Sequence, residues 1–116
     1  MKKELLSPAG DMESLLEAIH NGADAVYLAM KSFGARKFAK NFSKEEIIEA
    51  IKLCHLYGVR IYVTMNTLVK ESEVEGFLEQ VKYLHINGVD AIIMQDFGMI
   101  SLVRKMYPNL EIHAST

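Results

Sequence analysis

A cationic and aromatic segment between residues 31 and 42 has the composition of an anion-binding loop. It holds four cations, three phenylalanines and no acid, in a chain of net charge −2. Arginine holds carboxylate or phosphate in a planar fork, and aromatic rings beside cations stack on nucleobases. The alternative is a solvated loop that its phenylalanines fasten to the protein. The residues expected to bind an anionic substrate are Lys31, Arg36, Lys37 and Lys40.

Other polar residues stand where apolar, strand-like segments end, among them Asn66, Asp96 and His113. A histidine at a strand end can serve as a metal ligand or as an acid and base near neutral pH. The alternative for His113 is a structural role with hydrogen bonds to its neighbours. Asp96 opens a kinase-like Asp-Phe-Gly tripeptide, but no kinase lysine strand or catalytic loop accompanies it, which favours a helix N-cap.

Several chemistries are excluded by missing motifs. The chain has no H-E-x-x-H, so a self-contained zinc protease is unsupported. Ser115 lacks the G-x-S-x-G elbow of a hydrolase nucleophile. The single cysteine, Cys54, allows neither an internal disulfide nor a multi-cysteine metal site, and it falls on the apolar stripe of a helix. We therefore predict no metal site in this chain and no peptidase turnover by it alone.

A repeated join between helix and strand positions these residues. Segment 20–28 reappears as segment 86–94, and both carry Asn-Gly-x-Asp-Ala before an apolar stretch. Segment 56–63 repeats the join without the aspartate. Each glycine is expected to end a helix. Strands are predicted at residues 4–7, 25–29, 60–64, 91–94 and 110–113, and helices after the N-caps Asp11, Ser43 and Ser72 and over residues 97–107.

This alternation predicts an α/β fold with a parallel (βα)4β5 sheet in the strand order 1-2-3-4-5. A doubly wound sheet would need a G-x-G-x-x-G fingerprint after its first strand, and residues 7–12 lack it. A (βα)8 barrel needs about 250 residues, so residues 1–116 are predicted to form one domain, about half of a TIM-type barrel. Working residues would lie at the carboxyl ends of the strands. Asp24 and Asp90 precede their strands and are expected only to stabilise turns.

Composition and the open sheet predict a cytoplasmic protein that associates with itself. The chain is half hydrophobic, and no apolar run approaches the roughly 18 residues of a membrane span. A half-barrel leaves its first and last strands unpaired along one edge each, so we expect a homo-oligomer through these edges. Six apolar strand residues are expected to supply both faces of the sheet, leaving some exposed: Val26, Leu28, Ile61, Val63, Ile92 and Met94.

Five stretches, in order along the chain, make it resemble the N-terminal portion of peptidase family U32. They are Glu4-Leu5-Leu6-Ser7-Pro8-Ala9-Gly10-Asp11, Asn21-Gly22-Ala23-Asp24-Ala25-Val26-Tyr27-Leu28, Phe33-Gly34-Ala35-Arg36, Tyr62-Val63-Thr64-Met65-Asn66-Thr67 and His113-Ala114-Ser115-Thr116. The resemblance implies a nominal, collagenase-like protease or, more in keeping with better understood members, an enzyme of RNA base hydroxylation such as that of tRNA uridine, which draws on prephenate. Other members act in ubiquinone hydroxylation.

The resemblance also bears on the site and the cofactor. It implies that Arg36, Asn66, Asp96 and His113 lie nearest to substrate, with Asp96 and His113 as the catalytic candidates. It implies an iron–sulfur cluster in the full-length protein, held by cysteines downstream of the matched region, and no cofactor in this segment. The alternative function is a non-catalytic module that binds RNA, for example tRNA, or an anionic metabolite. A downstream cysteine cluster in the parent gene would favour the hydroxylase.

Overall fold

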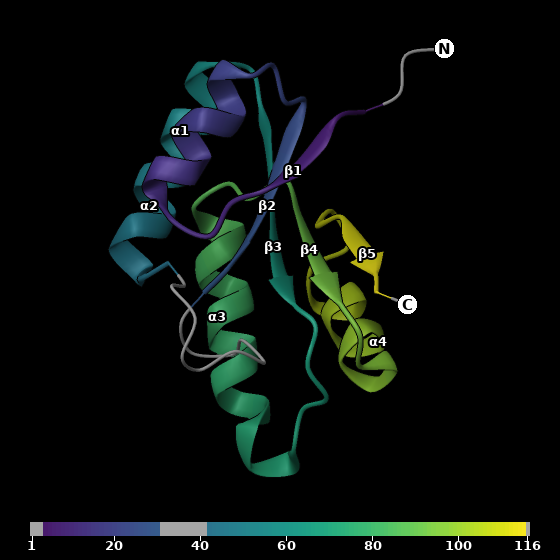
Figure 1. Ribbon diagram of the computed structural model, residues 1–116. Helices are drawn as coiled ribbons and strands as arrows, with labels where there is room; N and C mark the ends of the chain where they lie inside the picture. The colour runs from purple at the N-terminus through teal and green to yellow at the C-terminus, as the bar shows by residue number, and fades with distance from the viewer. Residues whose placement is uncertain (1–3, 31–41, 116) are drawn as a thin grey trace.

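Strands and helices alternate through residues 4–30 and 42–115, which are the residues described by the computed structural model (Figure 1). Cations Lys31, Arg36, Lys37 and Lys40 therefore lie outside the described residues. The elements are β1 (Leu6–Pro8), α1 (Met12–His20), β2 (Ala25–Ala29), α2 (Lys44–Leu56), β3 (Arg60–Met65), the short 3₁₀ helix η1 (Glu71–Glu73), α3 (Val74–Ile86), β4 (Ala91–Met94), α4 (Phe97–Met106) and β5 (Ile112–Ala114).

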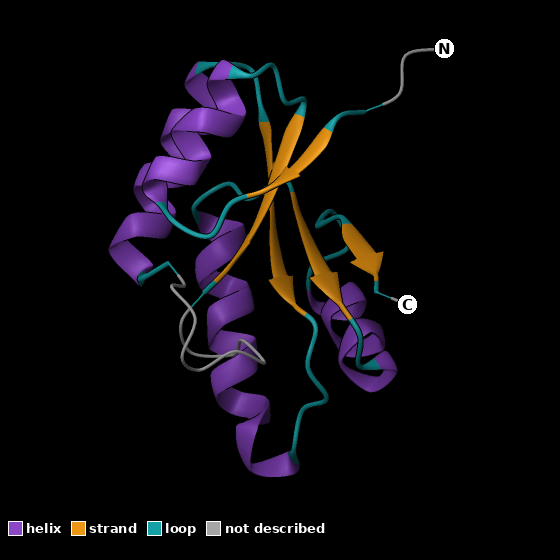
Figure 2. Ribbon diagram, viewed as in Figure 1, coloured by secondary structure: helices purple, strands orange, loops and turns teal. Residues whose placement is uncertain are grey.

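All strand pairs are parallel, and the sheet order is β1-β2-β3-β4-β5, as predicted for half of a barrel (Figure 2). Since β1 has a strand on one side only, the doubly wound alternative is wrong. The outer strands differ from expectation in their bounds: β1 and β5 begin two residues later and end one residue later than predicted. Both are edge strands with a partner on one side only, so fewer ladder hydrogen bonds fix where they begin and end.

The helices cover one face of the sheet, and six apolar strand residues point to that face. Val26, Leu28, Ile61, Val63, Ile92 and Met94 are buried in the cluster that contains the helix residues. The expectation that these six residues supply both faces is therefore wrong. The other face, the inner face of the half-barrel, has a small cluster of Ala25, Tyr62 and Ala91, with Tyr27 and Ile93 beside it. The sheet thus separates an apolar layer from a face of small, aromatic and polar residues.

Local signals fix most helix ends. Ser43 and Glu46 form the predicted capping box of α2, and Asp11 accepts the N–H of Ser14 at the start of α1. Gly22, Gly58 and Gly88 follow helix ends at positive φ, where a side chain would be strained. The predicted N-cap at Ser72 is wrong. Instead, Glu73 accepts the N–H of Lys70, and a turn of 3₁₀ helix leads into α3.

Candidate functional site

Asp96 lies just beyond β4, at the carboxyl edge of the sheet, where its carboxylate binds backbone groups of two segments. One oxygen accepts the N–H of Val69, in the loop after β3, at 2.9 Å, and the other accepts that of Met99 in α4 at 3.2 Å. Asp96 is thus the N-cap of α4 and ties the preceding loop to it. Hydrogen bonds from Val69, Met99 and Gly98 lower the pKa of Asp96, so this carboxyl is an anion at neutral pH.

Asn66 begins the loop that Asp96 holds. It follows the last residue of β3, Met65, which pairs with Met94 at the end of β4. The Asn66 side chain is exposed. The structure therefore brings the Asn66 loop and Asp96 together at one edge, as the barrel prediction requires. The contact is made through the backbone of Val69 and not through the Asn66 side chain.

His113 lies within β5 and faces the inner side of the sheet. It pairs in register with Ile93, and its ring packs edge-on against Tyr62 with centroids 4.9 Å apart. Its Nε2 lies 3.3 Å from a carboxylate oxygen of Glu111, which precedes the strand. His113 is half-exposed and has a carboxylate partner, the arrangement that orients an imidazole for proton transfer. No described contact joins it to Asp96, and both catalytic assignments stay predictions.

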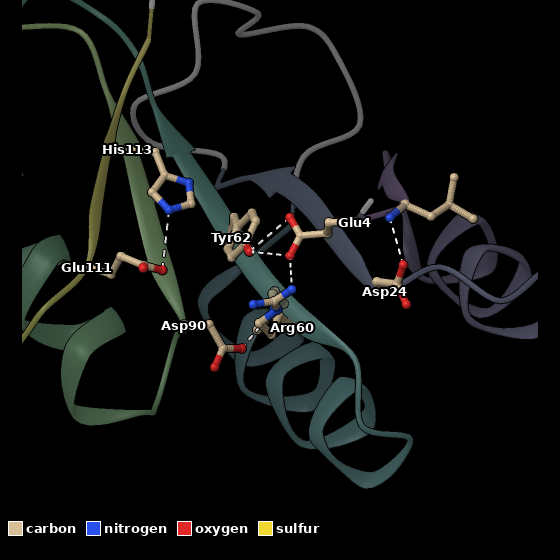
Figure 3. A network of polar contacts seen from close by, with 9 residues as sticks. Glu4, Asp24, Arg60, Tyr62, Asp90, Glu111 and His113 are labelled. Carbon is tan, nitrogen blue, oxygen red and sulfur yellow. Dashed lines mark hydrogen bonds and ion pairs between the residues drawn. The ribbon is translucent and has the colours of Figure 1, made fainter. Parts of the chain in front are cut away.

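A polar network, shown in Figure 3, continues from His113 across the inner face toward the amino ends of the strands. Glu4 accepts the hydroxyl of Tyr62 at 3.0 Å and pairs with Arg60. Burial of the Tyr62 ring, which is 3% exposed, and its hydrogen bond to Glu4 raise the Tyr62 pKa to about 12. The phenol is therefore a neutral donor at physiological pH. The sequence-predicted site residues did not include Glu4, Arg60, Tyr62 or Glu111, although Glu4 and Tyr62 fall within resembling stretches.

Asp24 and Asp90 lie at the opposite, amino-terminal edge, as predicted, but they bind the neighbouring strand segment and not the turns. Asp24 accepts the N–H of Leu5 at 2.7 Å, beside β1. Asp90 accepts the N–H of Ile61 in β3 at 2.8 Å and also pairs with His55 at 2.7 Å. Each aspartate immediately precedes an even-numbered strand and binds a residue of the neighbouring odd-numbered strand or the one just before it. Their hydrogen bonds link neighbouring strand segments of the sheet, at equivalent positions in the two halves of the chain.

Among residues 4–30 and 42–115 no group of three or more His, Cys, Asp or Glu is arranged to hold a metal ion. None of the helices described there is both long and apolar enough to cross a membrane. Cys54 is buried in the core, and burial, with the nearby Asp90 charge, raises its pKa to about 12. Its thiol is a core group with no access to solvent.

The amino-acid sequence matches the family model of peptidase family U32 over residues 10–116. The chain belongs to this family. It is 41% identical over 115 residues to the tRNA hydroxylation protein P1 of Bacillus subtilis, covering 99% of this chain and 27% of that protein. It is 45% identical over 113 residues to the 23S rRNA 5-hydroxycytidine C2501 synthase of Escherichia coli, covering 97% of this chain and 17% of that enzyme.

The solved structure of the U32 peptidase Mk0906 shares the fold. The likeness has a TM-score of 0.78 and covers 98% of this chain and 49% of that one, at 11% sequence identity. At this identity it shows the fold alone. The chain thus corresponds to half of that U32 structure, and it spans about a quarter or less of the two curated relatives.

Proposed function

We propose that this U32 chain is the N-terminal barrel part of an enzyme that hydroxylates a base in RNA, with tRNA uridine as the first substrate to test. The supporting observation is its identity of 41% and 45%, over nearly its whole length, to a tRNA hydroxylation protein and an rRNA 5-hydroxycytidine synthase. The protein works in the cytoplasm, where RNA is available to it.

The chain's own residues divide between binding and positioning in this proposal. Arg36 and the neighbouring lysines of segment 31–42 bind RNA phosphate or an anionic co-substrate such as prephenate. Asp96 keeps the Asn66 loop against α4 through its bond to Val69. His113, oriented by Glu111 and Tyr62, carries a proton at the inner face.

An iron–sulfur cluster does not fit the residues of this chain. Such a cluster is held by cysteine thiolates, four in the common types. The chain has one cysteine, and that thiol is buried in the core with a raised pKa. If the parent protein holds a cluster, its ligands come from outside these 116 residues.

Deletion of the full-length gene, followed by mass spectrometry of tRNA and rRNA nucleosides, tests the proposal. We expect a hydroxylated pyrimidine to disappear, to return with the wild-type gene, and to remain low with His113→Ala. An unchanged nucleoside profile would overturn the enzymatic function. RNA or prephenate binding by the chain, despite that unchanged profile, would then support the non-catalytic binding module.

Titration of the purified chain with tRNA and with prephenate tests the anion site separately. Arg36→Ala should bind more weakly than the wild type, and the difference should shrink with added salt because ions screen exposed charges. Equal affinity of the two proteins would remove the segment 31–42 from the binding site.

A further inference from the structure

Helix α4 differs in charge from the helices α1, α2 and α3. Each of these has a glutamate in its first turn, for example Glu13 in α1 and Glu75 in α3. Between Phe97 and Met106, α4 has no acid and carries Arg104 and Lys105 in its last turn. Its N-cap, Asp96, directs its carboxylate to backbone N–H groups. The exposed face of α4 is therefore positive in a chain whose net charge is −2.

A groove of about 360 Å³ lies along this face. Its lining comes from Phe97, Ile100, Ser101, Arg104 and Lys105. Phe97, Ser101 and Arg104 recur at helical spacing on one side of α4, and the distance from the first to the last is about 10 Å along the axis. Ile100 is buried and forms the floor, while Phe97 is 82% exposed. An aromatic ring stands at one end of the groove and two cations at the other.

Helix stability explains only part of this arrangement. Cations in the last turn of a helix interact well with its dipole, which accounts for Arg104 and Lys105. It gives no reason for a phenylalanine in water at the first position of the helix. Phe97 directly follows Asp96, so the groove begins at the carboxyl edge of the sheet, where the working residues of a barrel lie. A ring beside cations is the composition of a site for single-stranded nucleic acid.

We propose that the α4 groove binds a single-stranded segment of RNA. Phe97 stacks on a base, and Arg104 and Lys105 contact phosphates. This assignment rests on the proposed function, because it takes RNA as the substrate. An apolar protein helix would match Phe97 and Ile100, but it would desolvate both cations without giving them a charged partner. The two cations of the groove, Arg104 and Lys105, therefore favour RNA as the occupant.

Fluorescence anisotropy with a labelled oligouridine tests the groove in the 116-residue chain. Loss of base stacking in Phe97→Ala should weaken binding about tenfold. Phe97→Leu, which keeps the apolar character and loses the flat ring, should also bind more weakly. The double variant Arg104→Ala/Lys105→Ala should bind more weakly, and its affinity should depend less on salt between about 50 and 200 mM.

Matched controls remove exposed apolar and cationic side chains elsewhere on the surface. Leu56→Ala removes an exposed apolar side chain at the end of α2, and Lys52→Ala/Lys82→Ala removes two exposed cations from α2 and α3. Both should keep wild-type affinity. Circular dichroism checks that every variant is folded.

Three results would overturn the groove as an RNA site. They are no oligouridine binding by the wild type, equal weakening by the controls, and unchanged affinity in the α4 variants. If Arg36→Ala loses binding while the α4 variants keep it, the groove fails and the proposed function stands. The nucleoside profile of the deletion strain decides the proposed function independently.

Discussion

At the scale of single residues, Asp96 shows how one carboxylate can hold two segments of a site. It caps α4 and binds the backbone of Val69, so the loop carrying Asn66 and the start of α4 keep a fixed relation. The capping role is readable from the sequence, because an aspartate before an apolar helical pattern is a common N-cap. The hydrogen bond to Val69 cannot be predicted from the sequence, because it depends on how the loop after β3 folds back.

We expect Asp96→Ala to lower the free energy of unfolding by about 1–2 kcal/mol, through the lost N-cap and the unpaired Val69 N–H. The Asp96 pKa is below its ordinary value of 3.8 in the folded state. Its stabilisation is therefore present above that value and lost as pH falls through the lower, folded pKa. Urea unfolding at about pH 7 and pH 3 measures this. Asp96→Asn, which keeps a capping oxygen, is the control. Equal stability of wild type and Asp96→Ala at neutral pH would contradict the assignment.

Tyr62 gives the opposite pH dependence. Its phenol ionises near pH 12 in the folded chain, against an ordinary value of 10.0, so folding is opposed as pH rises from about 10 to 12. Tyr62→Phe should be less stable than wild type by about 1 kcal/mol at pH 8, because the bond to Glu4 is gone. This deficit should shrink at alkaline pH, which unfolding curves at increasing pH measure. A deficit that is constant with pH would show that the phenol titrates alike in both states.

At the scale of elements, the repeated helix–glycine–strand join predicts the strand order and most helix bounds. It also places Asp24 and Asp90 correctly on the stabilising edge. It does not reveal which way the strand side chains point. In segments such as Val26-Tyr27-Leu28 every residue is apolar or aromatic, so alternation cannot separate the two faces. The contact between Glu4 and Tyr62, which are 58 residues apart, likewise depends on the finished sheet.

Removal of the edge aspartates should have unequal effects. Asp90→Ala leaves the part-buried Ile61 N–H and the His55 ring without their acceptor, for a loss of about 1–3 kcal/mol. Asp24→Ala affects the more exposed Leu5 N–H and should cost less. Asp90→Asn, which keeps one acceptor oxygen, should lie between wild type and Asp90→Ala. Chemical denaturation of the four proteins ranks them. A larger loss for Asp24→Ala would reverse this account of the edge.

At the scale of the whole molecule, the expected self-association rests on the sheet edges alone, because the six apolar strand residues are covered by helices. On either side of β1, Leu5 and Ala9 bond to β2 or its flank, so by alternation Pro8 faces the open side, where it offers no N–H. In β5, Ala114 faces the open side. We expect a weak, concentration-dependent oligomer that Ala114→Pro reduces. Light scattering over a concentration series measures it, and a monomer at every concentration would refute the edge as an interface.

The isolated chain should have no peptidase turnover, although it belongs to a family called peptidases. It has neither a metalloprotease motif nor a nucleophile elbow. Pure protein incubated with casein or gelatin should leave both intact. Steady cleavage that disappears in His113→Ala would prove this expectation wrong and assign His113 to proteolysis.

The hydrogen bonds of Asp24 and Asp90 between neighbouring strands have an evolutionary consequence. In the sheet, Leu6 pairs with Ala25, and Tyr62 pairs with Ala91. Asp24 and Asp90 each precede one partner of these pairs, and each accepts the N–H of the residue that precedes the other partner. Each strand–helix–strand–helix segment therefore contains its own aspartate, which links the two strands of that segment by a hydrogen bond. A gene segment encoding one such unit can be duplicated in tandem without redesigning the join inside each copy. Growth of this sheet in steps of two strands, rather than one, preserves the aspartate at every second strand.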